Sequence, residues 1–378
     1  MYNRQSCRYI SMTDKKVDDV LQSLSSLNIS YDDKKGDNLN KLANPYSPKL
    51  KGELDRTKFN IFVQIADCGY YRWNPMNKAY QSLSAVKTAD EIIRHIDIDQ
   101  TPKEVLPLSQ LKLPRSFDMS LPPNAHPNKY PYGQYDVASI YVASKCRKVE
   151  LNKIDFIFGG STLEMLARHD ASNPYMVCRI PTTTENHTLL LVRKCKEYTQ
   201  DFADIGFQFE RYVTTGSMSH SNSIEWFEHM QIMEIDTKFK VLLCAEADAI
   251  DDDLDPIEIK VSKPQNWGTK VMFQMISSGS PTLCCGIKGP NNTLTNISMR
   301  SLSDVAADAL RNRSCNMLER SIVDGMQALH DQMVDKAVNE SYKISFSSQG
   351  ELSLQRAITR NAIMLPPDDV VKELLGFK

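Results

Sequence analysis

Two pairs of charged residues, each with a single residue between its members, mark the stretch of this chain that is best suited to chemistry. Glu246 and Asp248 follow an apolar run, and Glu258 and Lys260 lie a little further on, in a segment that alternates apolar and charged residues. Side chains two apart on a strand share a face, and neighbouring strands lie about 5 Å apart. If the two segments are neighbouring strands, three carboxylates and one ammonium group therefore converge on one spot.

Three carboxylates beside a lysine suit the metal-dependent hydrolysis of phosphodiesters. Mg²⁺ prefers oxygen ligands and usually shares them between carboxylates, water and a substrate phosphate. Such an ion lowers the pKa of its water and stabilises charge on the attacked phosphoryl oxygens, while the lysine orients the water or offsets charge in the transition state. The same pattern also fits an ordinary amphipathic strand with a solvated face, so the spacing alone leaves both interpretations open.

An acidic turn separates the two pairs. Asp251, Asp252, Asp253 and Asp255 are closed by Pro256, which is a combination typical of a solvated turn. We interpret these acids as turn residues rather than as ligands.

Apolar periodicity around these residues predicts an α+β protein. Apolar runs or alternation predict strands near residues 59–65, 175–180, 188–192, 230–235, 241–244, 257–261, 282–287, 342–346 and 352–354. Helical spacing predicts helices near residues 135–146, 163–168, 197–213, 267–276 and 313–338. The strands over 175–180 and 188–192 form a predicted hairpin across a polar turn.

Two of the predicted helices carry polar side chains that could reach the same spot. The helix over 197–213 has an apolar stripe bordered by Glu210, and the stripe consists of Tyr198, Phe202, Ile205, Phe209 and Tyr212. A glutamate in that position either flanks the core or leans into a cleft. The helix over 267–276 places Lys270 and Gln274 on one face, because residues four apart are neighbours on a helix.

Two other apolar patterns are interpreted as core rather than as binding surfaces. The aromatic segment 70–73 contains an arginine, and aromatic rings beside arginine can stack on bases, but packing at the edge of a domain is the commoner role. The helix over 313–338 has a stripe predicted to point inward, formed by Met317, Ile322, Met326, Leu329 and Met333. We take both patterns as core.

The composition is that of a globular protein without a global charge bias. The 378 residues are 41% hydrophobic and 24% charged, with a net charge of −2, so a nucleic-acid site would have to be a local basic cleft. The nine cysteines are scattered without a C-x-x-C pair, which argues against a zinc site and against a disulfide framework. The histidines are dispersed and the chain has no Walker-type loop, so carboxylates form the only cluster.

Composition also predicts how the chain is organised and where it acts. Residues 1–56 are polar and are predicted to form a partly disordered N-terminal segment, while residues 57–378 are predicted to form a single catalytic domain. The chain has no apolar signal core and no apolar run of 18 residues, so we expect no membrane association. We expect an intracellular protein, nuclear and/or cytoplasmic, and the sequence does not indicate its oligomeric state.

Four short motifs occur in an order that resembles the DXO family of decapping and 5′-end RNA-processing exonucleases. Residues 206–210 (GFQFE), 246–248 (EAD) and 258–260 (EIK) resemble the family's G-Φ-x-Φ-E, E-Φ-D and E-Φ-K motifs. The helix from Lys270 to Gln274 falls where the family has K-W-W-x-Q, and the segment over 282–293 resembles its next strand and turn. Each motif is short, but four in this order over roughly residues 150–300 make a fairly specific resemblance.

The resemblance implies a fold, an activity and a set of site residues. The implied fold has two packed mixed β-sheets flanked by helices, with a deep metal-binding pocket between the sheets. The implied activity is metal-dependent hydrolysis of RNA 5′ ends (5′-triphosphate, aberrant or NAD-capped), with 5′-3′ exoribonuclease activity and with an exoribonuclease as a partner protein. Lys260 would position the water or the scissile phosphate, Gln274 would line the pocket, and one or two Mg²⁺ or Mn²⁺ ions would be held by Glu210, Glu246, Asp248, Glu258 and Ile259.

The chain departs from the family where the resemblance expects an arginine that faces the pocket and the RNA. The family's W-R-G corresponds to Phe158-Gly159-Gly160, so the arginine position is Gly159, and the paired tryptophans are Val271 and Met272. An arginine fork contributes charge-assisted hydrogen bonds to phosphate, and its loss weakens substrate positioning. A catalytically weakened RNA-binding or regulatory paralogue is therefore the alternative hypothesis, and a DNA nuclease is a third.

Overall fold

The structure is a computed structural model that describes residues 47–73, 88–98, 100–117, 128–131, 138–170, 172, 175–184, 187–194, 197–200, 205–217, 226–262, 267–338, 340–357 and 368–375. The N-terminal segment up to residue 46 lies outside the described residues. Residues 48–56, predicted to belong to that segment, form helix α2 (Pro48–Arg56), whose buried Leu50 and Leu54 join the main apolar core.

Among the described residues, the first sheet has nine strands. In spatial order its strands are β16 (Leu352–Arg356), β15 (Ser341–Phe346), β6 (Tyr175–Ile180), β7 (Leu189–Lys194), β5 (Phe156–Gly159), β10 (Phe239–Glu246), β9 (Trp226–Ile235), β1 (Phe62–Trp73) and β2 (Ile96–Asp97). The middle strands β7, β5 and β10 pair in parallel, and the outer pairs are antiparallel, so the sheet is mixed.

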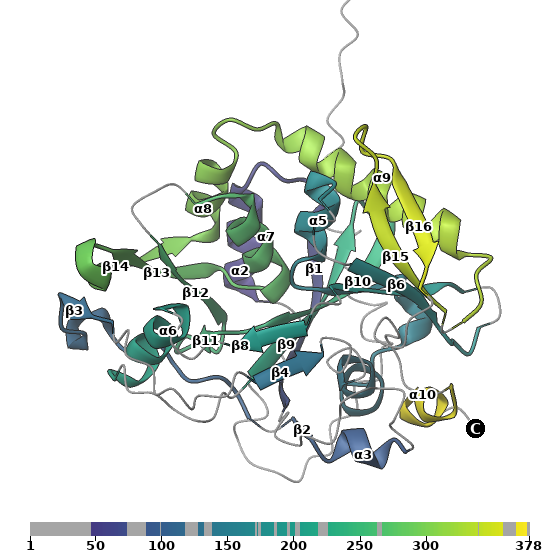
Figure 1. The fold of residues 1–378 in the computed structure, drawn as a ribbon, viewed down its shortest axis with the longest axis horizontal. Helices are drawn as coiled ribbons and strands as arrows, with labels where there is room; N and C mark the ends of the chain where they lie inside the picture. Colours follow the sequence, from purple (N-terminus) through teal and green to yellow (C-terminus); the bar gives the residue numbers. More distant parts are fainter. Residues whose placement is uncertain are drawn as a thin grey trace, which may run out of the picture. The chain divides into compact units, whose positions relative to one another are not determined.

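The middle strands read as unbroken apolar runs because both faces of this sheet are covered. Val241 and Leu243 of β10 point into one core, and Leu242 and Cys244 point into the other. In Figure 1, α5 (Thr162–Arg168), α7 (Thr269–Ser278), α8 (Leu302–Ala309) and α9 (Cys315–Met333) gather on one side of these strands. Helices α3 (Asp90–Ile93) and α10 (Asp368–Leu375) lie on the other side.

The second sheet has five strands and is also mixed. Strands β12 and β13 are parallel and are connected by α7, and the remaining pairs are antiparallel. Its order is β11 (Ala249–Ile250), β12 (Pro256–Ser262), β13 (Thr282–Lys288), β14 (Thr293–Ser301) and β3 (Arg115–Ser116), and a separate pair joins β4 (Asn128–Pro131) to β8 (Glu197–Gln200). Two mixed sheets flanked by helices confirm the predicted α+β fold class.

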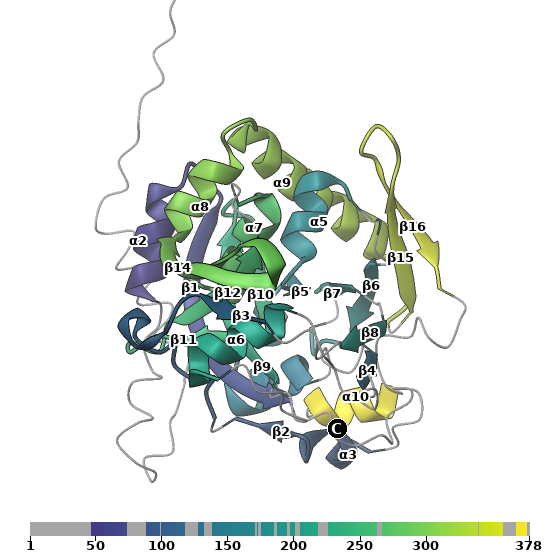
Figure 2. The same ribbon diagram turned by 60° about the vertical axis from the view of Figure 1, so that its left-hand side comes forward.

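Helix α6 (Ile205–Thr215) packs on one face of the second sheet (Figure 2). Phe209 and Tyr212 of α6 join Ile257 and Ile259 of β12 in one apolar cluster. The ring of Phe209 comes so close to Gly286 on β13 that a Cβ there would lie 2.8 Å from it. A glycine at that position therefore lets the helix lie directly on the strands.

The two acid-bearing segments are strands but not neighbours, so the condition under which the sequence would bring their charges together is not met in that form. Strand β10 ends at Glu246 within the first sheet, whereas β12 belongs to the second sheet and pairs with β11 and β13. The chain changes sheets between Glu246 and Ala249. Alternation along a segment shows that it is a strand, but it does not show which strand lies beside it.

Two predicted helices differ from the observed elements. The stripe over 197–213 spans two elements, because Tyr198 lies in β8 and pairs with Tyr130, and only the part from Ile205 onward is helix α6; Phe202 lies outside the described residues. The helix predicted over 313–338 runs from Cys315 to Met333, and Met317 is 71% exposed rather than inward.

The other core interpretations are confirmed. Tyr70 and Tyr71 are 3% and 0% exposed, so these two tyrosines of the aromatic segment are packed inside and do not form a binding surface. The rest of the methionine stripe on α9, from Ile322 to Met333, is buried.

The acidic turn is a turn, as predicted, and α2 binds it. The ammonium group of Lys49 lies 2.6 Å from a carboxylate oxygen of Asp251 and 2.7 Å from one of Asp253. The hydroxyl of Ser47 donates to Asp255 at 2.5 Å. These acids therefore stabilise the start of the described chain against the second sheet.

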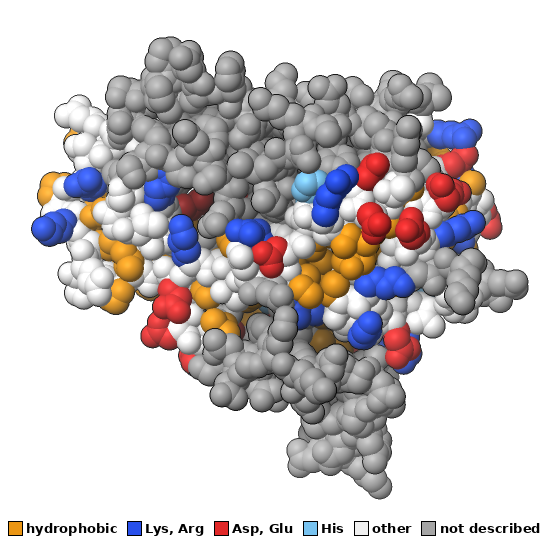
Figure 3. Space-filling model, turned by 90° about the horizontal axis from the view of Figure 1, so that it is seen from below, with side chains coloured by type: hydrophobic (Ala, Val, Ile, Leu, Met, Phe, Trp, Pro, Cys, Tyr) orange, Lys and Arg blue, Asp and Glu red, His pale blue; other side chains and the backbone are white. Residues whose placement is uncertain are grey.

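Charge is mixed on the face seen from below, where lysine, arginine and acidic side chains are interspersed among the described residues (Figure 3). Among those residues, no helix combines the length and the apolar character needed to cross a bilayer.

Candidate active site

Asp248 lies at the point where the chain passes from the first sheet to the second. Its side chain is 6% exposed, and its Oδ2 accepts hydrogen bonds from the backbone nitrogen of Ile259 at 2.7 Å and from the ammonium group of Lys260 at 3.2 Å. Glu246 lies just before it at the end of β10. The acid-x-acid pair therefore meets the acid-x-lysine pair through side-chain contacts, although the two strands are not neighbours.

Lys260 lies between two carboxylates. Its ammonium group is 2.5 Å from Glu258, 3.2 Å from Asp248 and 3.0 Å from the carbonyl oxygen of Ile259, to which it donates. The side chain of Ile259 is buried in the apolar cluster with α6, so this residue offers only its carbonyl oxygen as a ligand atom.

Glu210 reaches this group from α6. The neighbouring Phe209, Tyr212 and Val213 are buried against the second sheet and fix the helix, while Glu210 is half-buried. The charges that act on its carboxyl group are those of Asp248, Lys260, Glu246 and Glu258. The structure therefore brings all five predicted charged residues together.

Negative charge exceeds positive charge in this group. Burial and the Asp248 carboxylate raise the pKa of Glu210 well above its ordinary value, and the same two causes raise the pKa of Glu246 to about 8 even though Glu246 has an exposed side. Burial raises the pKa of Glu258 to about 7, with the Lys260 ammonium opposing the shift. Burial works against the charge of Lys260, but Asp248 and Glu258 outweigh it and raise its pKa.

These donors suit a hard divalent cation, because carboxylate and carbonyl oxygens are the ligands that Mg²⁺ and Mn²⁺ prefer. The raised pKa values show that one ammonium group does not balance four carboxylates. Within the described ranges, however, no three acidic, histidine or cysteine side chains are arranged so that one metal ion could contact them all. Cation binding would therefore require the Lys260 ammonium to move from between Asp248 and Glu258.

Gln274 lies on α7, as predicted, and its Oε1 is buried without a hydrogen-bond partner in the described part of the chain. A buried acceptor left unpaired costs about 1–3 kcal/mol, so a bound donor would stabilise this side chain. The C-terminal end of the same helix lies near the acids, because the Ser278 hydroxyl opposes the rise in the pKa of Glu258. Gln274 makes no hydrogen bond to the other five predicted residues among those that are described.

An arginine that the sequence did not single out fills the space beside Gly159. A Cβ on Gly159 would lie 2.7 Å from Cδ of Arg193 and 2.9 Å from its Nη1. Arg193 is 8% exposed; its Nη1 donates to the carbonyl oxygen of Cys244 at 3.1 Å, and its Nη2 lies 3.6 Å from the carboxylate of Glu228. Glu228 pairs directly with Glu246 across β9 and β10, so Arg193 places a buried positive charge next to the acid group.

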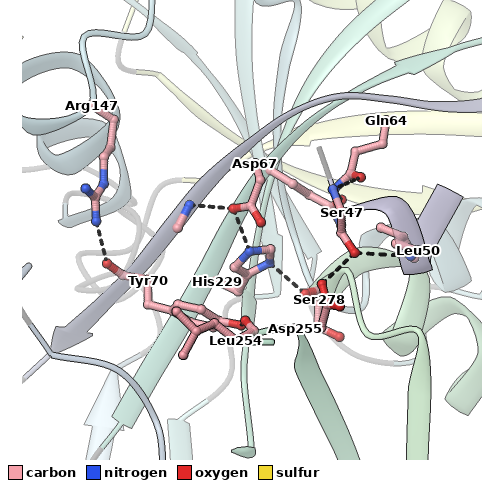
Figure 4. Close-up of polar contacts among 12 residues, drawn as sticks. Ser47, Leu50, Gln64, Asp67, Tyr70, Arg147, His229, Leu254, Asp255 and Ser278 are labelled. Atoms are coloured by element: carbon pink, nitrogen blue, oxygen red, sulfur yellow. Dashed lines mark hydrogen bonds and ion pairs between the residues drawn. The ribbon is translucent and has the colours of Figure 1, made fainter. Parts of the chain in front are cut away.

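A second polar contact missed from the sequence ties α7 to the first sheet (Figure 4). His229 of β9 is 1% exposed; its Nδ1 lies 2.8 Å from the carbonyl oxygen of Ser278 and its Nε2 lies 2.9 Å from Asp67. Both partners are acceptors, so the ring donates twice and is protonated. Burial opposes this charge, but Asp67 outweighs burial and raises the pKa of His229. No short spacing in the sequence links Asp67 to His229.

Comparison with solved structures finds yeast proteins of the same fold. The chain is 15% identical to S. pombe Rai1 in complex with 3′-FADP, with a TM-score of 0.58, over 81% of this chain and 98% of that one. It is 14% identical to Candida albicans Rai1 in complex with pU5 and Mn²⁺ (TM-score 0.54; 84% and 97% covered) and 11% identical to K. lactis Dxo1 in complex with manganese (TM-score 0.54; 80% and 92% covered).

At the level of sequence, no protein-family model and no curated protein matches the chain. Identities of 11–15% show a shared fold and do not show a shared activity. The likeness nevertheless covers most of both chains. The chain therefore has the fold of the DXO-family proteins Rai1 and Dxo1, as the order of its four motifs predicted.

Proposed function

We propose that this protein is a divalent-cation-dependent hydrolase that acts on RNA 5′ ends. The observation that carries the proposal is the meeting of Glu210, Glu246, Asp248 and Glu258 around Lys260, supplied by helix α6, by one strand from each sheet and by the link between the sheets. Like charges gathered in one place destabilise a fold, and the burial of the Asp248 and Glu258 side chains adds to that cost. A site that binds a cation and a phosphate accounts for their presence.

Each residue of the candidate site has a distinct role in this proposal. The four carboxylates and the carbonyl oxygen of Ile259 would hold Mg²⁺ or Mn²⁺, which when bound would offset their charge and stabilise negative charge on the attacked phosphoryl group. The pKa of the Lys260 ammonium group is raised, so the group stays protonated and can bind a phosphate oxygen beside the acids. The amide group of Gln274 can donate to the same phosphate.

The chemistry of the substrate is supported by what the similar structures contain. S. pombe Rai1 was solved with 3′-FADP, Scheffersomyces stipitis Rai1 with (3′-NADP)⁺ and calcium ion, and Candida albicans Rai1 with pU5 and Mn²⁺. We propose for this chain 5′-triphosphate, aberrant or NAD-capped RNA as substrates, followed by 5′-3′ exonuclease activity on the RNA body.

The experiment uses purified protein and four RNAs that differ only at the 5′ end: triphosphate, monophosphate, methylated cap and NAD cap. Each RNA is incubated with and without Mn²⁺, and the products are resolved by size and by end label. Asp248→Ala tests the site, and Asp252→Ala is the matched control, because Asp252 is an exposed acid of the turn. Mn²⁺-dependent products from the wild type and Asp252→Ala, but not from Asp248→Ala, are expected.

The alternative function, a catalytically weakened RNA-binding paralogue, is favoured by Gly159. Where the family arginine would lie, the space is filled by Arg193, which bonds Cys244 and lies beside Glu228 instead of facing out. RNA binding without any metal-dependent product from the four RNAs would favour this alternative. Equal activity of Asp248→Ala and the wild type would contradict the site itself.

A further inference from the structure

A basic pocket away from the carboxylates is lined by residues of α5, of α7 and of the loop between α8 and α9. These elements lie side by side in Figures 1 and 2. Its volume is about 320 Å³. Four cationic side chains line it together with one carboxylate, that of Asp308; the cations are Arg168, Lys270, Arg311 and Arg313. In a chain with a net charge of −2, this local excess of positive charge is a distinct feature.

The one acid in the pocket does not neutralise the cations. The carboxylate of Asp308 already lies 2.7 Å from Arg300 and 2.7 Å from Arg311, so two arginines share its charge. Arg168 is paired on its other side with Glu164 at 2.8 Å. Lys270 and Arg313 are exposed and make no ion pair with any described residue. Two full positive charges therefore remain for a ligand.

The backbone at the start of helix α7 adds to the positive charge of the pocket. Helix α7 begins at this pocket; its N-cap residue Gly268 provides no capping side chain, and its first turn contains no acid. The free N–H groups and the positive end of the helix therefore point toward the pocket uncompensated. Phosphate is the anion that such donors bind best, because it accepts several charge-assisted hydrogen bonds at once.

We propose that this pocket binds a backbone phosphate of a single-stranded RNA whose 5′ end lies among the carboxylates. Helix α7 relates the two places: Lys270 is near its start, and Ser278 at its end lies near enough to Glu258 to affect the pKa of that carboxyl group. Ten residues of helix span roughly 15 Å, and because α7 is largely buried a strand must pass around it, which at ~3.4 Å per stacked nucleotide takes at least about four nucleotides. The pocket would thus contact the RNA body. This proposal rests on the proposed function only for the identity of the bound strand as RNA.

Binding is measured with single-stranded RNA in EDTA, so that no hydrolysis is needed. Two labelled 5′-phosphorylated RNAs, a dinucleotide and a strand of about 20 nucleotides, separate the 5′ end from the body. The pocket variants are Lys270→Glu/Arg313→Glu and the milder Lys270→Gln/Arg313→Gln. Lys343→Glu/Arg320→Glu is the control for the first, since it changes the same net charge at exposed positions elsewhere.

The expected result is that the charge-reversed pocket variant weakens binding of the long strand about tenfold. Because each neutralised phosphate contributes about 0.7 to the salt dependence of single-strand binding, losing the one phosphate contact lowers that slope by about 0.7. The dinucleotide should bind all variants equally, and the control should bind both RNAs as the wild type does. The glutamine variant should show the same pattern more weakly.

Three outcomes would overturn the proposal. The long strand could bind the pocket variants and the control equally, which would make the effect one of net charge. Inorganic phosphate could bind the wild type and not the pocket variants while the long strand is unaffected, which would assign the pocket to a free anion. Binding of polyglutamate, and not of RNA, could depend on the pocket residues, which would assign the pocket to an acidic protein partner. Each outcome stands whether or not the protein hydrolyses RNA.

Discussion

Gly159→Ala is expected to destabilise the protein through Arg193. The added Cβ would lie 2.7 Å from Cδ of Arg193 and 2.9 Å from its Nη1, whereas carbon atoms pack best at about 3.5–4.0 Å. Forcing extra volume into a packed interior costs about 1–3 kcal/mol. Moving Arg193 aside instead loses its bond to Cys244, which at 3.1 Å is worth about 1.5–3 kcal/mol for a charged donor. Either route lowers the free energy of unfolding by about 1–3 kcal/mol.

A double-mutant cycle with Arg193→Ala separates this cause from others. Truncating Arg193 removes the atoms that the methyl group meets, so Gly159→Ala should cost almost nothing in that background. The measurement is urea denaturation of the four proteins, followed by far-UV circular dichroism. Gly52→Ala is the control, because a Cβ at Gly52 meets nothing within 4 Å and lies in helix α2, where alanine stabilises by about 0.5–1 kcal/mol.

Equal costs of Gly159→Ala in both backgrounds would refute the reasoning, and so would a Gly159→Ala protein as stable as the wild type. The first result would mean that the methyl group is resisted by something other than Arg193. The second would mean that the space beside Gly159 is free, and that the arginine expected there from the family could be restored.

Three further predictions concern charge. Asp67→Asn should lower stability by about 1.5–3 kcal/mol near pH 6. The pKa of His229 is raised above 6.5, so the stability that its charge contributes is complete below pH 6.5 and is lost as the pH rises through the raised pKa. The pKa of Asp67 is lowered below 3.8, so the stability that its charge contributes is complete above pH 3.8 and is lost as the pH falls through the lowered pKa. Denaturation of both proteins across pH should therefore show the largest difference between pH 3.8 and 6.5, and a constant difference would contradict the ion pair. Lys260→Met should reduce kcat for RNA hydrolysis about 10²–10³-fold with a smaller change in KM, and a purely structural role would instead lower stability and leave kcat per folded molecule unchanged. Mn²⁺ affinity measured by calorimetry should rise between pH 6 and pH 8, because Glu258 and Glu246, with pKa values of about 7 and about 8, must lose protons to bind it; affinity that is flat with pH would exclude them as ligands.

The strands and the charged residues that the structure brings together could be predicted because their signals are local. Strands β10 and β12 are recognisable from their own apolar patterns, and Glu210, Asp248 and Lys260 are recognisable from short motifs in a fixed order. The helical stripe over 197–213 misled because Tyr198 fits its spacing by coincidence while lying in β8. Met317 was predicted to point inward but is exposed. The next residue, Leu318, is the one that faces the core, and adjacent residues on a helix point about 100° apart.

What could not be predicted depends on contacts between distant parts of the chain. Strands β10 and β12 belong to different sheets, and their charged residues meet because Asp248, between the sheets, accepts a hydrogen bond from the backbone of Ile259. Arg193 lies beside Gly159 only because β7 and β5 pair in one particular register. His229 and Asp67 are 162 positions apart and meet through the pairing of β1 with β9. Sheet order and register are properties of the whole fold, and no single segment encodes them.

The most direct measurement of the central claim is the binding of Mn²⁺ to the carboxylates, followed by the electron paramagnetic resonance signal of the free ion. Wild-type protein should remove the signal in a saturable way, Asp252→Ala should bind equally, and Asp248→Ala should bind at least about tenfold more weakly. Circular dichroism of the three proteins shows that each is folded. Saturable binding by Asp248→Ala with the affinity of the wild type would contradict the claim that these carboxylates form one cation site.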